Sequence, residues 1–160
     1  MIFLTLGSQM FQFNRVLKEI DDLIEKKIID EEVVAQIGYS DYEPRNYQYK
    51  KFFDREEFSV IMDQCTIVIT HGGTGAIISA VKKNKKVIAV PRLKKYGEHV
   101  DDHQLQLLHQ FSEMNLIHPC YDLEKIGEAY LNIESEEFMS YISNTKNVIM
   151  NIQKYIEGIE

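Results

Sequence analysis

The chain has 160 residues, of which 44% are hydrophobic and 27% charged. This composition is that of an ordinary globular protein and excludes disordered and fibrous classes. Its net charge of −7 argues against non-specific nucleic-acid binding, which depends on neutralising phosphates. The two cysteines, Cys65 and Cys120, have neither metal-site nor disulfide-framework spacing, which fits a reducing compartment.

Short apolar runs alternate with helical patterns along the chain. A strand is predicted where an apolar run of four to six residues is ended by glycine, proline or polar residues, and a helix where apolar residues recur every three or four positions. In chain order the pattern predicts strand 2–6, helix 14–28, strand 33–37, strand 49–53, helix 55–64, strand 67–70, helix 76–83, strand 87–90, helix 100–113, strand 116–118 and a long C-terminal helix from 135 onward.

Alternating strands and helices predict an α/β fold, with a Rossmann-like parallel sheet covered by helices on both faces. No linker or repeat divides residues 1–160, so we expect a single domain. In such sheets ligands bind beyond the carboxyl ends of the strands. Chemistry is therefore expected in the loops that follow Leu6, Ile37, Thr70 and Val90.

The most specific motif follows the strand at 67–70 and is composed of His71, Gly72, Gly73, Thr74 and Gly75. Glycines let a ligand approach the backbone, and a helix N-terminus offers free N–H groups, so the motif suits a diphosphate. It is not a P-loop, because no Gly-Lys-Ser/Thr follows, and it lacks the third glycine of a dinucleotide fingerprint. The alternative is a glycine turn that serves only strand–helix packing.

A second group of polar residues lies at 98–104, after the strand at 87–90. Glu98, Asp101, Asp102, His103 and Gln104 could bond sugar hydroxyls. The four-residue spacing of two histidines there, at positions 99 and 103, is also found among zinc ligands. The sequence shows no third ligand, and acidic residues are common at helix starts, so no metal site is predicted.

A third motif, Gly7-Ser8-Gln9, follows the first strand and reads either as ligand contacts or as a turn with a helix cap. Together with residues 71–75 and Asp102-His103-Gln104, it gives the chain a resemblance to the C-terminal, donor-binding domain of glycosyltransferase family 28. The resemblance covers nearly the whole chain. Residues 94–104 are most similar to the bacterial capsule and exopolysaccharide branch of free-standing domains.

The resemblance implies the C-terminal half of the GT-B fold and the catalytic, donor-binding subunit of a two-component inverting glycosyltransferase. It implies transfer of a hexose, with galactose as our expectation, from a UDP-sugar to a lipid-linked saccharide, with no metal and no cofactor. The acceptor would be held by a membrane-anchored partner that recruits this cytoplasmic chain to the inner face of the membrane. The alternatives are a non-catalytic nucleotide-sugar-binding regulatory subunit and a nucleotide-binding fold with an unrelated ligand.

The resemblance also assigns roles to residues. The diphosphate would meet Ser8 and the glycine loop, uracil would lie near Phe53, and His103 and Gln104 would face the donor sugar. Ser79 stands where many members carry an acidic ribose ligand, which implies either a weaker ribose contact or a carboxylate from elsewhere, such as that of Glu98. The catalytic base would be His99 or Glu98, or come from the partner. The full donor-binding set is Gly7, Ser8, Gln9, Phe53, His71, Gly72, Gly73, Thr74, Gly75, Ser79, Asp102, His103 and Gln104.

Two further segments leave alternatives open. The predicted C-terminal helix would be capped by Ser135 and carry an apolar stripe over 138–159. That stripe either completes the core or, from Val148 onward, docks the acceptor subunit or a second copy of the chain. Residues 82–95 contain seven basic and no acidic side chains, which suit either an anionic membrane or simple helix termination.

Overall fold

The computed structural model describes residues 1–158 and contains a six-stranded sheet in the order β3-β2-β1-β4-β5-β6. Every neighbouring pair of strands is parallel. The predicted α/β class is therefore confirmed, as is the parallel sheet. The strands are β1 (Ile2–Thr5), β2 (Val33–Gln36), β3 (Gln48–Lys50), β4 (Ile67–His71), β5 (Lys86–Val90) and β6 (His118–Pro119).

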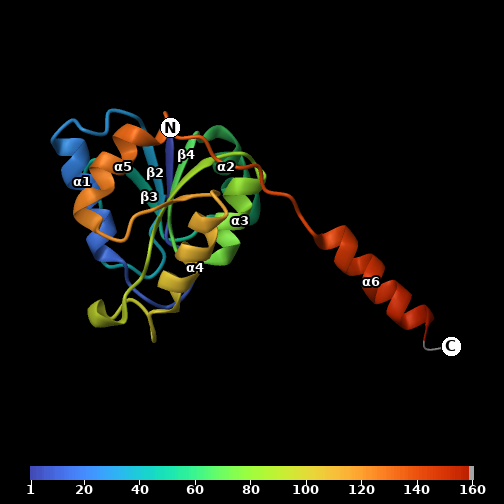
Figure 1. Ribbon diagram of the computed structural model, residues 1–160. Coiled ribbons are helices and arrows are strands. Elements are labelled where there is room, and N and C mark those ends of the chain that lie inside the picture. Colours follow the sequence, from blue (N-terminus) through green and yellow to red (C-terminus); the bar gives the residue numbers. More distant parts are fainter. Residues whose placement is uncertain (159–160) are drawn as a thin grey trace.

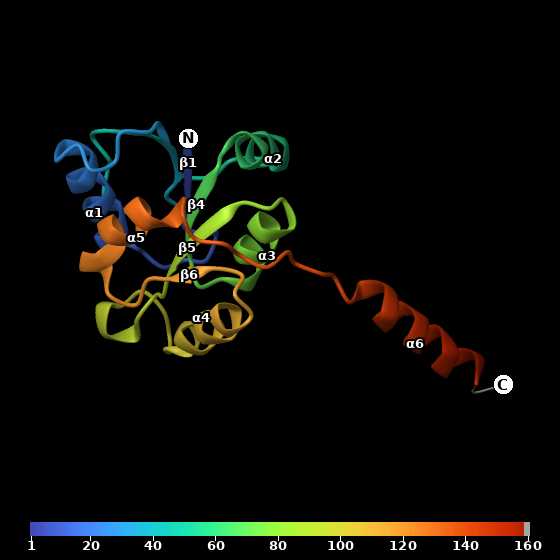
Figure 2. The same cartoon turned by 45° about the horizontal axis from the view of Figure 1, so that its top comes forward.

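Helices cover both faces of the sheet, with α1 and α5 on one face and α2, α3 and α4 on the other (Figures 1 and 2). The helices are α1 (Asn14–Glu25), α2 (Arg55–Gln64), α3 (Thr74–Lys82), α4 (His103–Glu113), α5 (Ile126–Ile133) and α6 (Thr145–Glu157), with single 3₁₀ turns at η1 (Lys94–Tyr96) and η2 (Leu123–Lys125).

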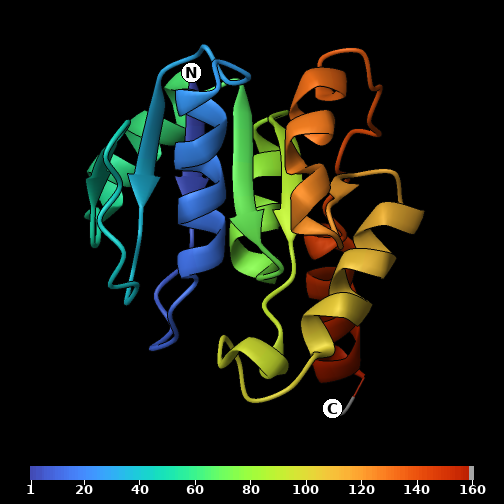
Figure 3. The same ribbon diagram turned by 90° about the vertical axis from the view of Figure 1, so that its left-hand side faces the viewer.

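The first strand illustrates why both faces need cover. Side chains alternate across a strand, so Ile2 and Leu4 pack under α1 and α5 while Phe3 packs under α2, α3 and α4. All three side chains are fully buried. A strand that is apolar on both sides is typical of a parallel sheet between two helical layers. Figure 3 shows one of these layers, formed by α1 and α5, lying over one face of the sheet.

Helix α5 is the element that the sequence analysis missed. Its apolar residues Ile126, Ala129, Tyr130 and Ile133 follow helical spacing and are buried against the sheet. The helix has only 8 residues and follows directly on η2, so its pattern is short. The predicted start of α4 at residue 100 was also wrong, because the helix begins at His103.

The prediction of one continuous C-terminal helix from residue 135 was wrong. Ser135 caps no helix; its hydroxyl donates to the Asn132 carbonyl, 2.8 Å away, just after α5 ends. Residues 136–144 then form an irregular segment, in which Phe138 packs against the core beneath α1 and α5 and Tyr141 against the core beneath α2, α3 and α4. The apolar residues of this segment therefore hold the chain to the domain from both layers.

Helix α6 lies apart from the sheet and its covering helices (Figures 1 and 2). None of its residues is buried. The part of the apolar stripe that lies in α6 therefore does not complete the core. Ile159, which was included in the predicted stripe, lies outside the described residues. The exposed apolar side chains of the helix are Val148, Ile149, Met150, Ile152, Tyr155 and Ile156.

The basic run at 82–95 does not form one surface. Lys86 begins β5 and donates to carbonyls at the end of α5, whereas Arg92 follows the other end of β5 and is buried. Lys83 pairs with Asp63. The sequence run is thus split between opposite edges of the sheet, which removes the single basic face considered above. Within residues 1–158, no helix is long and apolar enough to cross a membrane.

Candidate functional site

A cavity of about 500 Å³ opens at the carboxyl edge of the sheet, beside β1 and β4. The strand order reverses between these two strands, and ligands of open α/β sheets bind at such points. Among residues 1–158, no acidic side chain lines the cavity, although acidic residues exceed basic ones in the chain. Its lining consists of Thr5, Gly7, Ser8, Gln9, Gln36, Phe58, His71, Gly73, Thr74, Gly75, Ala76 and Ser79.

Two glycines allow the loops around this cavity to approach each other. Gly7 has φ +74°, and a Cβ there would lie 2.6 Å from His71 Cε1. A Cβ on Gly73 would collide with Nε2 of the same ring. Larger residues at either position would therefore displace the imidazole, and Gly7 would in addition be strained.

The N-terminus of α3 faces the cavity through Gly73, Thr74, Gly75 and Ala76. Its N-cap residue, Gly73, has no side chain that could satisfy the first backbone N–H groups, and the first turn holds no acidic residue. Free N–H groups and the positive end of the helix dipole favour an anion. The cavity thus has the chemistry of a phosphate site.

His71 is a neutral imidazole in the wall of this cavity. The Thr70 hydroxyl donates its proton to the Thr5 carbonyl at 2.8 Å, so it accepts from His71 Nδ1–H at 3.3 Å. Nε2 is then a free acceptor beside Gly73. Burial, followed by the positive charge of Arg92, lowers the pKa of His71 to about 4.

The low pKa of His71 predicts acid sensitivity of the fold. The imidazole has a pKa near 6.5 when unfolded, so between pH 6.5 and about 4 the unfolded chain binds a proton that the folded chain does not. Stability should fall as the pH drops through this window, by up to about 3 kcal/mol from this residue. Urea unfolding at pH 7 and pH 4.5 should show a smaller decrease for His71→Gln than for the unmodified chain. Equal decreases would contradict the assignment.

Behind the cavity, the buried side chains of Gln104 and Arg92 hold the loops in place. Gln104 Oε1 accepts from the backbone N–H of Gly72 at 3.1 Å and of Arg92 at 2.9 Å. The Arg92 guanidinium is stacked over the Phe13 ring, and burial lowers its pKa to about 10. It donates to the backbone carbonyls of Leu6, Phe11, Gln12 and Glu98. This one side chain therefore joins the loop after β1 to the loop after β5.

Glu98 is 1% exposed and serves the same framework. Its carboxylate accepts from Arg15 Nε at 2.7 Å and from the backbone N–H of Leu93 at 3.0 Å. Both oxygens of this buried carboxylate are thus already held by donors of the framework, which leaves neither free to meet an acceptor hydroxyl. Of the two candidate bases in this chain, the geometry therefore favours His99.

The family follows from a comparison of the whole sequence with known protein families. The model described as "Glycosyltransferase family 28 C-terminal domain" matches residues 1–157. The chain belongs to this family. The expectation drawn from the motifs is thus confirmed at the level of the family.

Individual relatives agree with this membership. The "UDP-N-acetylglucosamine transferase subunit ALG13" of Candida albicans is 27% identical over 124 residues, which cover 76% of this chain but only 38% of that relative. A solution structure of ALG13 matches with a TM-score of 0.57 at 16% identity, covering 89% of both chains. Acinetobacter baumannii MurG matches with a TM-score of 0.57 at 14% identity, over 82% of this chain and 40% of that one. The two structures establish likeness of fold.

The structure gathers most, but not all, of the predicted family residues at the cavity. Gly7, Ser8, Gln9, His71, Gly73, Thr74, Gly75 and Ser79 line it. Phe53 does not line it; the rings of Phe53 and Phe58 both pack on Phe3, but only Phe58 of α2 belongs to the described lining. Gly72 is buried behind the lining, where a Cβ would collide with Leu108.

Sequence reasoning missed Thr5 and Gln36, although both stand at carboxyl ends of strands. Gln36 Oε1 accepts from the Phe53 N–H at 3.1 Å and so links the loop after β3 to the cavity. The buried Thr5 hydroxyl has no hydrogen-bond partner among the described residues. The signal that could have identified them was a polar residue closing an otherwise apolar strand.

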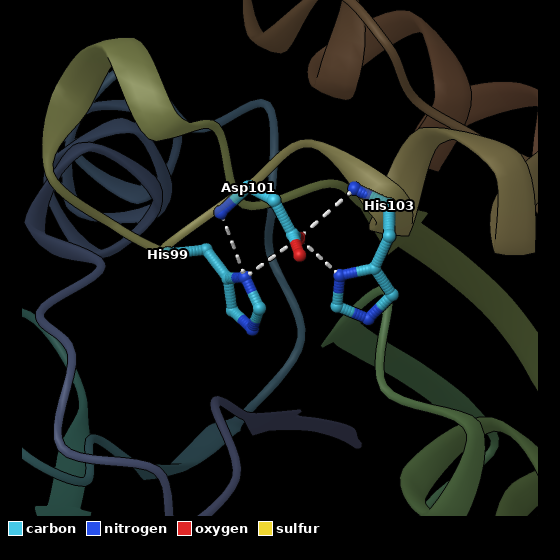
Figure 4. A group of neighbouring side chains, drawn as sticks. All are labelled: His99, Asp101 and His103. Atoms are coloured by element: carbon cyan, nitrogen blue, oxygen red, sulfur yellow. Dashed lines mark hydrogen bonds and ion pairs between the residues drawn. The ribbon is translucent and has the colours of Figure 1, made fainter.

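A second group of polar side chains lies just before α4 (Figure 4). Asp101 Oδ1 is 3.1 Å from His99 Nδ1 and also contacts His103 Nδ1. One ring nitrogen or carboxylate oxygen of each of these three side chains lies within 4.8 Å of the others. Asp101 thus joins the two histidines in one cluster, which the spacing of the histidines in the sequence did not reveal. Asp102 contacts neither ring and accepts from the backbone N–H of Lys94 at 2.8 Å.

Proposed function

We propose that this family 28 domain binds a UDP-sugar and catalyses inverting transfer of its sugar as the donor-binding subunit of a two-component glycosyltransferase. The observation that carries the proposal is the acid-free cavity at the carboxyl edge, walled by the N-terminus of α3 and by Gly7-Ser8-Gln9. It offers hydroxyls and free N–H groups to a diphosphate and no carboxylate to repel it.

In this proposal the diphosphate lies against Ser8 and the first turn of α3. As the sugar leaves, charge builds on the departing UDP, and fixed N–H groups together with the helix dipole stabilise it. Phe58 offers an aromatic surface for the uracil, beside the Gln36 amide. We propose that the sugar is a hexose. Galactose is our expectation from the family resemblance alone, whereas UDP-N-acetylglucosamine is the sugar nucleotide in the name of the C. albicans relative.

Transfer also needs a group that takes the proton of the acceptor hydroxyl. We assign this to His99, whose ring is buried between Phe11 and His103, at centroid distances of 5.3 Å and 4.7 Å. Its Nδ1 faces Asp101, which leaves Nε2 for the proton. His103 at the start of α4 is proposed to face the donor sugar, together with the free amide nitrogen of Gln104.

We further propose that the acceptor is a lipid-linked saccharide in capsule or exopolysaccharide assembly, held by a membrane-anchored partner at the inner face of the membrane. The C. albicans relative is named as a subunit, which supports a divided enzyme. The exposed α6 is the segment proposed to bind that partner or, in its absence, a second copy. A regulatory subunit without catalysis would bind the same nucleotide but transfer no sugar, and a transfer assay with the partner separates these alternatives.

Donor binding should survive chelation. The cavity lining has no carboxylate that could present a divalent cation to a diphosphate, so its own N–H groups must supply the attraction. Calorimetric titration with UDP, UDP-galactose and UDP-N-acetylglucosamine should give the same affinities with and without excess EDTA.

ADP and NAD serve as matched nucleotides in this titration and are expected to bind at least tenfold more weakly. Loss of UDP binding on chelation would contradict the proposed way of holding the diphosphate. Equal binding of ADP would favour a general nucleotide-binding protein over a UDP-sugar transferase.

A further inference from the structure

One carboxylate, that of Asp101, holds both imidazoles that the proposed function uses. Asp101 Oδ1 contacts Nδ1 of His99 and Nδ1 of His103 and accepts the backbone N–H of His103 at 3.2 Å. Figure 4 shows both rings turned so that Nδ1 faces this carboxylate and Nε2 points away from it. The His99 side chain is only 6% exposed, whereas those of Asp101 and His103 are 57% and 46% exposed.

These contacts select the tautomer of each ring. The hydrogen bonds from His103 hold the pKa of Asp101 below its usual range, so the carboxylate is ionised and accepts only. Nδ1 of each histidine must then carry its proton. The Asp101 N–H also lies 3.4 Å from His99 Nδ1, but the carboxylate is closer and fully charged, so donation to it prevails.

We propose that Asp101 is the positioning residue of the transfer reaction, which fixes the Nδ1–H tautomer of His99 and His103 and so leaves both Nε2 atoms as acceptors. The inference rests on the proposed function. In the step itself, the acceptor oxygen bonds to the anomeric carbon, the bond from that carbon to the UDP oxygen breaks with its electron pair, and the acceptor proton moves to His99 Nε2. The imidazolium so formed is stabilised by the adjacent carboxylate.

The test must distinguish this positioning role of Asp101 from a purely structural one. The Asp101 carboxylate accepts the His103 N–H where α4 begins, and Asn at this position would keep that bond. Asp101→Asn therefore preserves this bond, while it removes the charge and replaces the second carboxylate oxygen by an amide nitrogen. Asp122→Asn is the matched control, because the Asp122 carboxylate likewise accepts the N–H two residues further on, that of Glu124 at 3.2 Å, and has no hydrogen bond to a histidine among the described residues.

The experiment has two readouts, one of which does not need the reaction. Imidazole ¹⁵N chemical shifts of the full chain should report Nδ1–H for His99 and His103, and a mixture with Nε2–H in Asp101→Asn. With the acceptor subunit present, Asp101→Asn should lower kcat by a factor of about 10² or more, the range lost with a general base. The acid limb of the pH–rate profile should move to lower pH, because the charge that favours the imidazolium is gone. The substitution does not alter the neighbouring titratable side chains Arg92 and His71, so the shift of the acid limb can be attributed to the Asp101 charge.

UDP affinity should change less than twofold in Asp101→Asn, and Asp122→Asn should match the unmodified chain in every readout. Unchanged ring tautomers in Asp101→Asn, or changed tautomers with an unchanged kcat and pH profile, would overturn the proposal. If the unmodified chain neither binds UDP nor transfers sugar, the proposed function fails instead. The ¹⁵N spectra still decide whether Asp101 sets the tautomers, so the two failures are distinguishable.

Discussion

Gly75→Val is expected to reduce UDP affinity by at least tenfold while the domain stays as stable as the unmodified chain. A Cβ at Gly75 meets nothing within 4 Å, so the new side chain enters open space in the free protein. That space belongs to the cavity, where the branched side chain would keep the diphosphate away from the first turn of α3. Gly and Val differ little in helix propensity, and the small difference favours Val. Calorimetry with UDP and thermal unfolding measure the two properties.

Lys82→Val is the control for this substitution, because it places the same side chain at the exposed far end of the same helix. It should leave UDP affinity unchanged. Gly73→Val should behave differently from Gly75→Val, because its side chain collides with His71 and should reduce stability as well as binding. UDP affinity of folded Gly75→Val equal to that of the unmodified chain would show that the glycine loop serves packing alone.

Removal of α6 is expected to abolish association while leaving the domain intact. Truncation after Ser143 takes away the whole helix, none of whose residues is buried, so the free energy of unfolding should change by less than about 0.5 kcal/mol. The apolar residues Ile149, Ile152 and Ile156 are 50%, 53% and 61% exposed and need a partner surface. Light scattering coupled to size exclusion should show self-association of the full chain and a monomeric truncated chain. Co-purification with the co-expressed acceptor subunit should be lost in parallel.

A triple Ile→Ser variant at positions 149, 152 and 156 separates loss of the apolar face from loss of the helix as a whole. It should reproduce the truncation in both association assays and keep UDP binding. A less stable truncated chain would mean that α6 contributes to the fold. Retained association of the triple variant would place the docking surface elsewhere on the domain.

The sheet could be predicted because its signal is local. Ile2, Phe3 and Leu4 are apolar whichever face they take, and such a run has few alternatives to a buried parallel strand. The conformation of residues 136–144 could not be predicted, because the apolar residues at 138 and 141 fit a helical stripe as well as they fit an extended segment. In the structure the segment is irregular, with residue 138 packed against the core of one helical layer and residue 141 against the core of the other. Such contacts cannot be inferred from the spacing of apolar residues.

In the candidate site, too, some features could be predicted from the sequence and others could not. The glycine loop could be singled out because consecutive glycines between a strand and a helix mark a place where the backbone turns tightly or is approached closely. The contact of Glu98, one of the candidate bases, with Arg15 could not be predicted, because the two residues lie 83 positions apart in the sequence. Asp101 was noted only as a sugar contact, since its bonds to two imidazoles depend on the turn that precedes α4. Long-range partners and loop conformations were therefore what the sequence alone could not supply.

The irregular segment after α5 also limits where α6 can go. Tyr141 packs against the domain and α6 begins at Thr145, so only residues 142–144 are unattached. Three residues span at most about 10 Å, which makes this a short tether rather than a flexible linker. Whatever binds α6 is kept beside the same domain at an effective concentration in roughly the millimolar range. Even weak direct contacts between a partner and the carboxyl edge of the sheet would then be largely occupied, so the catalytic interface would not need to be tight on its own.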